Sequence, residues 1–365
     1  MKILPFITFI LLVTLLMACG DDRPDTVFIV PTNLEVSSSL SSTVQGQVSV
    51  TASATNGRHY AFNFGDGSDE VKNRTGSATH NYAQSGTYKV VVKSFGNSSE
   101  FISKELEVEV EITKFTSGFL SDSSYAGMTL VWSDEFDGSS LNSANWSHET
   151  GTGMNGWGNN ELQYYRSENT TVSDGFLQID VKREDFSGSS YTSSRITSQD
   201  KQEFQYGRID IRAILPLGNG LWPALWMLGA DFPEVGWPQC GEIDVMEMRG
   251  EQPDRVISSA HYGPNFNGRR VDNNDGNPYR LSSGTFADEW HVFSLIWDEN
   301  KIQWLVNDEV SFTLPIAGDR TSYFRKEFFF IFNVAVGGDF VTSPDETTVF
   351  PQRMYVDYVR VFQAQ

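Results

Sequence analysis

The sequence predicts an all-β protein made of two β-sandwiches, a small one followed by a larger β-jelly roll. Short segments in which apolar and polar residues alternate recur along the chain, and a period of two is typical of half-buried strands. Clear examples are residues 88–93, 176–181 and 207–213. No segment carries a sustained apolar stripe with a period of 3.6 residues, so we expect few helices. Many antiparallel strands in the C-terminal region fit two packed sheets whose concave face can hold a ligand.

The composition limits the class of partner. The 365 residues include 47 acidic and 27 basic side chains, which gives a formal net charge of −20. Nucleic acids and anionic membrane surfaces are bound by basic patches, so this charge argues against both. Hydrophobic residues make up 39% and aromatic residues 13%, which is enough for a large core and for an aromatic-lined cleft. We expect a monomer.

Residues 1–18 have the form of an export signal, with a basic residue, an apolar run and small residues before the cleavage point. The apolar run is short for a membrane span. Residues 16–20 resemble the bacterial lipobox, after which cleavage leaves Cys19 as a lipidated N-terminus. We therefore expect an exported protein, anchored by lipid at the bacterial outer membrane and exposed at the cell surface. Residues 19–26 would form a polar tether.

Residues 27–112 predict a small immunoglobulin-like β-sandwich of short strands separated by turns. The string Phe62-Asn63-Phe64-Gly65-Asp66-Gly67-Ser68 places an Asp-Gly turn after an aromatic strand. Together with the strings at 80–82 and 86–88, it resembles the polycystic-kidney-disease-type (PKD) domain. Such domains commonly act as spacers, and the resemblance implies that role here.

Residues 113–126 are rich in Ser and Gly and lack periodicity, so we expect a linker that can also pack on the large domain at 127–365. The chain has two cysteines, and Cys19 falls in the targeting segment. The folded part therefore has one thiol and no disulfide. We interpret this thiol, Cys240, as a small buried packing residue because no neighbouring His would activate it.

Three carboxylates stand among strand-forming residues in the stretch Gly241-Glu242-Ile243-Asp244-Val245-Met246-Glu247-Met248. In a regular strand, Glu242 and Asp244 would share one face and Glu247 would point to the other. A β-bulge around Val245-Met246 would return Glu247 to the shared face, and bulges recur beside active sites. The carboxyl groups of the two Glu would then lie about 5–6 Å apart, the separation of a retaining glycosidase. An acidic strand face in solvent is the alternative that this stretch alone leaves open.

Several separate motifs in the large domain agree with one family. Besides the acidic stretch, they lie at residues 131–136, 157–165, 221–228, 236–238 and 354–361. Together they resemble the laminarinase-type branch of glycoside hydrolase family 16, whose members fold as β-jelly rolls. The resemblance implies a retaining endo-β-1,3-glucanase that hydrolyses internal bonds of laminarin-like polysaccharide by double displacement.

The same resemblance implies a role for each carboxylate. Glu242 would be the nucleophile, Glu247 the general acid and then the general base, and Asp244 the group that orients Glu242. This chemistry requires no cofactor. His261, on the strand expected beside these residues, would contact the leaving-group side of the substrate or Glu247.

Aromatic and polar residues around the acidic stretch predict substrate subsites. Flat indoles suit the apolar faces of pyranose rings, so we place Trp237 near the cleavage point and Trp222 and Trp226 at neighbouring subsites. Asn159 and Arg195 match polar contacts of the family's negative subsites. The other tryptophans considered are assigned to the core, namely Trp132, Trp146, Trp290, Trp297 and Trp304.

Family members often bind one structural Ca²⁺ on the convex face through backbone carbonyls and an Asp, and the resemblance implies Glu135, Gly175 and Asp357 as the matching positions. Two alternatives to the predicted function stay open. One is the same chemistry on a mixed-linkage β-1,3-1,4-glucan or a galactan, because loops decide the linkage. The other is a non-catalytic surface glycan-binding lipoprotein, against which the intact Glu242 and Glu247 argue.

Overall fold

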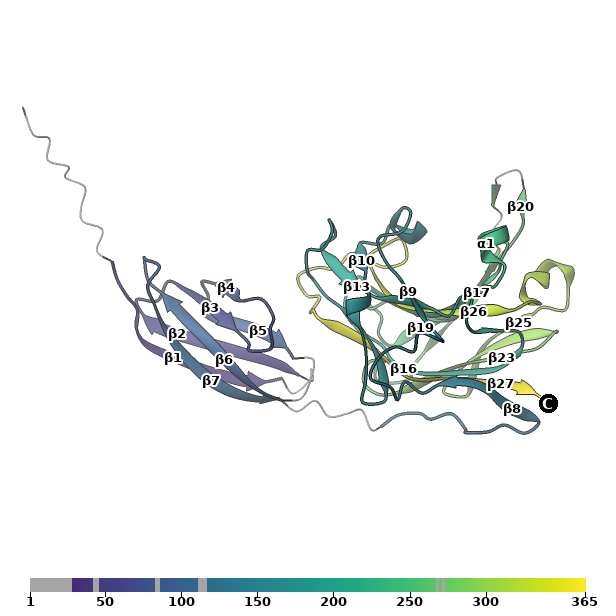
Figure 1. Ribbon diagram of the computed structural model, residues 1–365, viewed down its shortest axis with the longest axis horizontal. Coiled ribbons are helices and arrows are strands. Elements are labelled where there is room, and N and C mark those ends of the chain that lie inside the picture. The colour runs from purple at the N-terminus through teal and green to yellow at the C-terminus, as the bar shows by residue number, and fades with distance from the viewer. Residues whose placement is uncertain (1–27, 42–45, 83–85, 111–116, 267–268, 271–272) are drawn as a thin grey trace, which may run out of the picture. The chain divides into compact units, whose positions relative to one another are not determined.

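The structure is a computed structural model (Figure 1) that describes residues 28–41, 46–82, 86–110, 117–266, 269–270 and 273–365. The chain divides into two compact units, Met1–Ile112 and Thr113–Gln365. Strands dominate both units, which confirms the all-β prediction. The predicted signal, the tether and Cys19 lie outside the described residues. In the described part of the chain, no helix is long and apolar enough to cross a membrane.

The first unit is a sandwich of two antiparallel sheets, in the orders β1-β2-β5 and β4-β3-β6-β7. Its strands are β1 (Thr32–Leu40), β2 (Gln47–Thr55), β3 (His59–Asn63), β4 (Val71–Asn73), β5 (Ser77–Asn81), β6 (Gly86–Phe95) and β7 (Phe101–Val110). Alternate residues of these strands point inward, as the period of two predicted. Phe62 and Val92 from one sheet and Val50 from the other are fully buried between them.

The described residues of the second unit form two eight-stranded antiparallel sheets. One, the outer sheet, has the order β11-β12-β27-β16-β23-β24-β25, with β8 also paired to β27. The other, the cleft sheet, has the order β22-β19-β18-β17-β26-β14-β9, with β15 also paired to β26. Figure 1 shows β9, β17 and β26 in one layer over β16, β23 and β27 in the other, which is the predicted jelly-roll sandwich.

The strand bounds follow the sequence pattern closely. The outer sheet contains β8 (Met128–Asp134), β11 (Thr170–Ser173), β12 (Phe176–Val181), β16 (Gly207–Ile214), β23 (His291–Trp297), β24 (Lys301–Val306), β25 (Glu309–Pro315) and β27 (Gln352–Ala364). The cleft sheet contains β9 (Ser147–Glu149), β14 (Arg195–Thr197), β15 (Glu203–Phe204), β17 (Leu221–Gly229), β18 (Glu242–Met248), β19 (Arg255–Tyr262), β22 (Asn273–Arg280) and β26 (Phe328–Val336). Two short pairs complete the strands, β10 (Gln163–Tyr165) with β13 (Tyr191–Ser193) and β20 (Asn265–Phe266) with β21 (Arg269–Arg270).

Helices in the described residues are short. They are the π-helical turn η1 (Gly156–Asn160), the 3₁₀ turns η2 (Ser167–Asn169) and η3 (Asp319–Phe324), and α1 (Phe232–Val235). Of these, η1 and α1 carry residues that line the cleft described below.

One hydrophobic core fills the space between the two large sheets. Ile209 and Ile211 from β16 and Ile243 and Met246 from β18 belong to this core, and all four are fully buried. Trp146, Trp290, Trp297 and Trp304 are also buried, and Trp132 packs against the core with part of its surface exposed. The core assignment of these tryptophans is therefore confirmed.

Cys240 is fully buried beside Leu228, Phe329 and Ile331. Burial raises the pKa of its thiol to about 12. A thiol of that pKa is protonated and unreactive at neutral pH. Its predicted role as a packing residue is confirmed.

The C-terminal part of the predicted linker, residues 117–126, is hydrogen bonded to the second unit. The Phe119 amide donates to the Trp290 carbonyl (2.8 Å), and the Ser121 amide donates to the Tyr358 hydroxyl (2.8 Å). The Tyr125 hydroxyl donates to Asp210 Oδ2 (2.8 Å), a fully buried carboxylate. We call residues 117–126 the docked segment. It is part of the second unit, although its Ser- and Gly-rich sequence predicted a linker.

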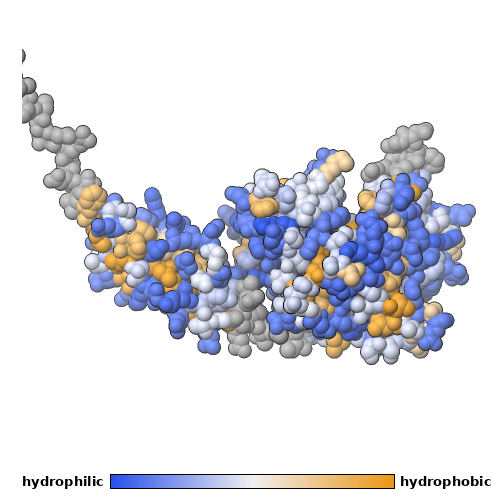
Figure 2. Space-filling model, viewed as in Figure 1, coloured by the Kyte–Doolittle hydropathy of each residue, from blue (hydrophilic) through white to orange (hydrophobic). Residues whose placement is uncertain are grey.

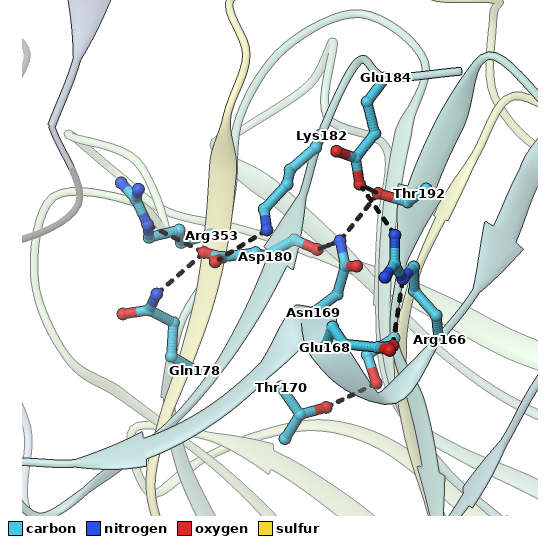
Figure 3. Close-up of polar contacts among 11 residues, drawn as sticks. Arg166, Glu168, Asn169, Thr170, Gln178, Asp180, Lys182, Glu184, Thr192 and Arg353 are labelled. Carbon is cyan, nitrogen blue, oxygen red and sulfur yellow. Dashed lines mark hydrogen bonds and ion pairs between the residues drawn. The ribbon is translucent and has the colours of Figure 1, made fainter. Parts of the chain in front are cut away.

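A polar network beside the short strand β13 fixes the chain just before Arg195 (Figure 3). The Asn169 amide group donates to the Asp180 carbonyl (2.9 Å) and to the Thr192 hydroxyl (3.0 Å). Asp180 in turn accepts a hydrogen bond from Arg353 (3.0 Å). The network therefore ties η2, β12, β13 and β27 together on the approach to β14.

Candidate active site

The bulge predicted in the acidic strand is present in β18. Asp244 pairs with Trp226 of β17 while Met246 pairs with the adjacent Leu225, so Val245 is one extra residue in β18. The ladder with β19 shifts at the same place, between Asp244 and Glu247. The extra residue returns Glu247 to the face that carries Glu242 and Asp244. All three carboxylates accordingly line one cleft.

Asp244 is held tightly at the base of this cleft. Its side chain is 3% exposed, and its Oδ2 accepts a hydrogen bond from the Ser259 hydroxyl (2.8 Å). Ser259 is the residue opposite Asp244 in β19. The buried Trp304 indole donates to the Asp244 carbonyl (2.9 Å) from the core side. Both the carboxylate and the backbone at the bulge are thus fixed.

Glu247 has a raised pKa although two side-chain donors contact it. The Trp222 indole donates to Glu247 Oε1 (3.0 Å), and the Ser259 hydroxyl lies 3.2 Å from Oε2. Burial, and next the nearby charge of Asp244, raise the pKa of Glu247 to about 8, against smaller opposing effects of His261 and these two donors. The carboxyl group is therefore mostly protonated at neutral pH.

His261 lies across the ladder from Glu242. Its Nε2 is 3.9 Å from Glu242 Oε1 and 3.6 Å from Asp244 Oδ2. The ring therefore stands on the Glu242 side of the acidic group, because residues paired across two strands share a face. The charge of His261 also acts on Glu247, so the predicted contact with the leaving-group side of the substrate or Glu247 stays a prediction.

The cleft over the carboxylates is open and measures about 1260 Å³. Trp222, Trp226 and Trp237 all line it, with their indoles partly exposed. The Trp237 ring lies 6.2 Å from the His261 ring, next to Glu242. Trp222 and Trp226 come from β17, the strand beside β18. The structure brings these three predicted tryptophans to the site.

Asn159 and Arg195 line the same cleft. Asn159 lies in η1, and its amide group donates to Glu161 Oε1 (3.2 Å). Arg195, on β14, forms an ion pair with Glu149 (2.5 Å). Its guanidinium lies 4.6 Å from the Trp157 ring and 4.9 Å from the Trp226 ring, between two aromatic faces. Both predicted polar residues are thus positioned where a sugar could reach them.

Comparison with known proteins identifies this arrangement. The family model described as "Glycosyl hydrolases family 16" matches residues 157–359, and the model described as "PKD domain" matches residues 33–110. The first match spans more than half of the chain and includes the bulged strand. The chain belongs to glycosyl hydrolase family 16.

Similar proteins include family enzymes from several bacteria. "Glucan endo-1,3-beta-glucosidase A1" of Niallia circulans is 38% identical over 274 residues, 68% of this chain and 40% of that protein. "Beta-glucanase" of Rhodothermus marinus is 38% identical over 64% of this chain and 85% of its own length. The structure of the laminarinase catalytic domain of Thermotoga maritima MSB8 is similar to the second unit, with 43% identity, a TM-score of 0.61, and coverage of 65% of this chain and 99% of that one. The chain therefore spans less than half the length of the Niallia circulans relative.

Sequence reasoning missed several residues that line this family 16 cleft. Ser259 lies two residues before His261 on β19, and the strand period of two could have placed it on the same face. Trp157, Glu149 and Asn333 come from separate elements that only the fold brings together. Glu161 lies in the family motif at residues 157–165, but its spacing in that motif does not show that it, rather than its neighbours, lines the cleft.

Glu161 ends a chain of hydrogen bonds that reaches the cleft tryptophans. It accepts from Gln163 (2.7 Å) and from the Tyr165 hydroxyl (3.1 Å). Tyr165 accepts from Asn333 (3.0 Å), and Asn333 accepts from the Trp226 indole (2.7 Å). Burial raises the pKa of Glu161 in spite of these donors and Arg195. The chain fixes the orientation of Trp226.

Arginines pair with the two carboxylates among the residues implied as calcium ligands. Both carboxylate oxygens of Glu135 accept hydrogen bonds from Arg360 (2.9 and 2.7 Å), and Asp357 Oδ2 accepts from Arg212 (2.6 Å). A guanidinium bound to a carboxylate already supplies the positive charge that a calcium ion would bring. The predicted site uses the backbone carbonyls of Glu135 and Gly175 and a carboxylate oxygen of Asp357, so the ion pair of the Glu135 side chain does not test it. A bound Ca²⁺ stays a prediction.

Proposed function

We propose that the protein is a retaining endo-β-1,3-glucanase that hydrolyses internal bonds of laminarin-like polysaccharide. The observation that carries the proposal is the pair Glu242 and Glu247, placed on one face of β18 by the bulge at Val245. Glu247 holds a proton near neutral pH, and Glu242 faces the open cleft beside His261. Two carboxyl groups in unequal surroundings are what acid–base chemistry on a glycosidic bond requires.

In the first step, Glu242 attacks the anomeric carbon of the sugar. The bond from that carbon to the leaving oxygen breaks, and Glu247 gives its proton to the oxygen. An ester bond between the sugar and Glu242 forms, and the shortened chain leaves. Glu247 is now ionised, which the Trp222 indole favours because it donates a hydrogen bond to Oε1.

In the second step, the ionised Glu247 takes a proton from water, and the oxygen of this water attacks the same carbon. The ester bond to Glu242 breaks, and both carboxyl groups return to their starting states. Two inversions at one carbon retain the β configuration. Asp244 orients Glu242 and is itself held by Ser259.

The shape of the cleft favours cleavage within a chain. An open cleft of about 1260 Å³ can hold several sugar units on both sides of the carboxylates. Trp237 next to Glu242, and Trp222 and Trp226 on β17, offer apolar faces to successive rings. The similarity to a glucan endo-1,3-beta-glucosidase of Niallia circulans and a laminarinase of Thermotoga maritima supports β-1,3-glucan as the substrate.

Replacing Glu242 by Gln tests the proposal. We expect kcat to fall by at least about 10³-fold, because no covalent intermediate can form, with glucan binding retained. Glu234→Gln is the matched control, since Glu234 is an exposed residue of α1 that does not line the cleft. Unchanged hydrolysis by Glu242→Gln would refute the assignment. Proton NMR of the first products should show the β-anomer, and an initial α-anomer would contradict retention.

The alternatives give different results in one substrate panel. Laminarin, lichenan, agarose and carrageenan are incubated with the wild-type protein, and reducing ends are counted. Fastest release from laminarin supports the proposal. Fastest release from lichenan or agarose supports the same chemistry on a mixed-linkage glucan or a galactan. Binding of laminarin without any release from it would support a glycan-binding lipoprotein.

We also propose that Cys19 carries a lipid that anchors the exported protein at the outer membrane, facing the cell surface, with the PKD unit as a spacer and the chain as a monomer. The lipobox-like string at 16–20 supports this anchor. Labelling of expressing bacteria with an alkyne-bearing fatty acid should mark the wild-type protein and leave Cys19→Ala unmarked. Equal labelling of both would reject Cys19 as the anchor. Protease added to intact cells, and light scattering of the detergent-solubilised protein, test surface exposure and the monomer.

A further inference from the structure

Three side chains of the cleft present donor atoms that could bind one metal ion. Glu242 and Asp244 are two residues apart on β18, so their carboxylates lie on one face, and His261 is opposite Glu242 on β19. The nearest ligand atoms of the three residues all lie within 4.8 Å of one another. Among the described residues, these three are the His, Cys, Asp and Glu side chains that lie close enough to share one metal ion.

The distances approach those of a metal centre. His261 Nε2 is 3.6 Å from Asp244 Oδ2 and 3.9 Å from Glu242 Oε1. Tetrahedral zinc, with bonds of about 2.0–2.2 Å, separates its ligand atoms by about 3.3–3.6 Å. Small rotations of Glu242 and His261, whose side chains are 17% and 18% exposed, would close the remaining difference. The Ser259 hydroxyl holds Asp244 in place (2.8 Å), so Glu242 and His261 are the side chains that would rotate.

The donor set selects the class of ion. One imidazole nitrogen with two carboxylate oxygens suits zinc, copper, nickel and cobalt. Calcium takes six to eight oxygen ligands, and magnesium keeps an octahedral shell of oxygen atoms, so both fit this trio poorly. Three protein ligands leave a coordination position open toward the cleft, where a water molecule would complete the shell.

We propose that Glu242, Asp244 and His261 form a binding site for a divalent transition-metal ion such as Zn²⁺, and that the bound ion excludes the substrate. A metal on Glu242 occupies the oxygen that would attack the sugar, and it stands next to Trp237 at the cleavage point. The exclusion rests on the proposed function, whereas the binding site itself does not. The ion is an inhibitor and takes no part in hydrolysis.

Binding is measured first on a variant that keeps the three ligands. Glu247→Gln is titrated with ZnCl₂ in a calorimeter, and we expect one ion per chain at the site. Adding His261→Asn should weaken this binding by at least about 100-fold, since even groups that only support a ligand contribute about 10–100-fold. His59→Asn is the matched control, because His59 is an exposed histidine of the first unit, and its affinity should equal that of the parent.

Cobalt gives a second, spectroscopic readout of the site. Co²⁺ added to Glu247→Gln should show the intense visible absorption of a low-coordinate site, and a laminarin oligosaccharide should remove it. Weak bands of hydrated cobalt, or zinc affinity that is unchanged by His261→Asn, would overturn the proposal. Thermal melting curves verify that each variant is folded.

Inhibition is measured last, on the wild-type protein. Zn²⁺ should raise the apparent KM for laminarin with little change in kcat, EDTA should restore the rate, and Ca²⁺ and Mg²⁺ at equal concentration should have no effect. Zinc that lowers kcat alone would contradict exclusion. If the protein binds zinc at these residues but cleaves no glucan, the proposed function fails and the metal site stands. If it cleaves laminarin but shows no zinc site, the metal site fails alone.

Discussion

The Trp304 indole on the outer sheet donates a hydrogen bond to the Asp244 carbonyl at the bulge of β18 on the cleft sheet. A bulge interrupts the regular ladder, so backbone groups there need other partners. Trp304 supplies one through the core, from the opposite side to the cleft. The geometry of the carboxylates therefore depends on a residue that no substrate touches.

Replacing Trp304 by Phe should reduce both stability and activity. The change leaves the buried Asp244 carbonyl without its donor, at a cost of about 1–3 kcal/mol in unfolding free energy, and it loosens the bulge. We expect kcat on laminarin to fall about tenfold or more at a temperature where the variant is fully folded. Chemical denaturation and initial rates measure the two effects.

Trp297→Phe is the matched control. Trp297 is equally buried, and its indole donates to the Phe324 carbonyl (3.1 Å), away from β18. It should lose similar stability and keep the wild-type kcat. Equal loss of kcat in both variants would show that Trp304 acts only through general stability.

The activity should have an alkaline limb set by Glu247. The pKa of this carboxyl group is raised to about 8, and only its protonated form can give a proton to the leaving oxygen. Hence kcat/KM should be constant as the pH approaches 8 from neutrality, and it should fall about tenfold per pH unit above pH 8. Initial rates on laminarin between pH 5 and about pH 10 measure this limb. A limb near the usual pKa of a glutamate would contradict the raised value.

Trp222→Phe should move the alkaline limb to higher pH. The indole donates to Glu247 Oε1, which favours the ionised form and lowers the pKa, so its loss raises the pKa further. Trp226→Phe is the control, because that indole donates to Asn333 and not to Glu247. Trp226→Phe should raise KM for laminarin and leave the pH of the alkaline limb unchanged. The pH profiles of the two variants separate these effects, and a downward shift in Trp222→Phe would refute the assignment.

Glu247→Gln should change how stability depends on pH. The folded protein keeps the Glu247 proton up to about pH 8, whereas the unfolded chain releases it near pH 4.5. The wild-type contribution is thus fully present below about 4.5 and is lost as pH rises toward 8, by at most about 1.4 kcal/mol per pH unit. Because Glu247 lines an open cleft, screening by water makes the actual change in unfolding free energy smaller than this limit. The variant should melt with a flatter pH profile and a higher Tm relative to wild type at pH 8 than at pH 5, and parallel profiles would count against the shift.

Much of the fold could be predicted because strand periodicity is local. The alternation in β12 and β16 lies in the sequence itself, and so does the spacing of the three carboxylates that requires a bulge at Val245. Ser259 and Trp304 reach Asp244 from strands 15 and 60 residues away, so their partners depend on sheet order. Sheet order is a long-range property that one sequence does not reveal by periodicity. The same holds for the ion pairs of Glu135 and Asp357, which join separate strands.

The docked segment determines the N-terminal boundary of any fragment that contains the second unit alone. A fragment that begins at residue 127, where the sequence places the start of the domain, would lack Tyr125 and Ser121. The fully buried Asp210 would lose the Tyr125 hydroxyl, and Tyr358 would lose its partner Ser121. A fragment that begins at Ser117 keeps these bonds and the pairing of Gly118 with Trp290. For recombinant production of the isolated catalytic unit, the N-terminal boundary should therefore be set ten residues earlier than composition suggests.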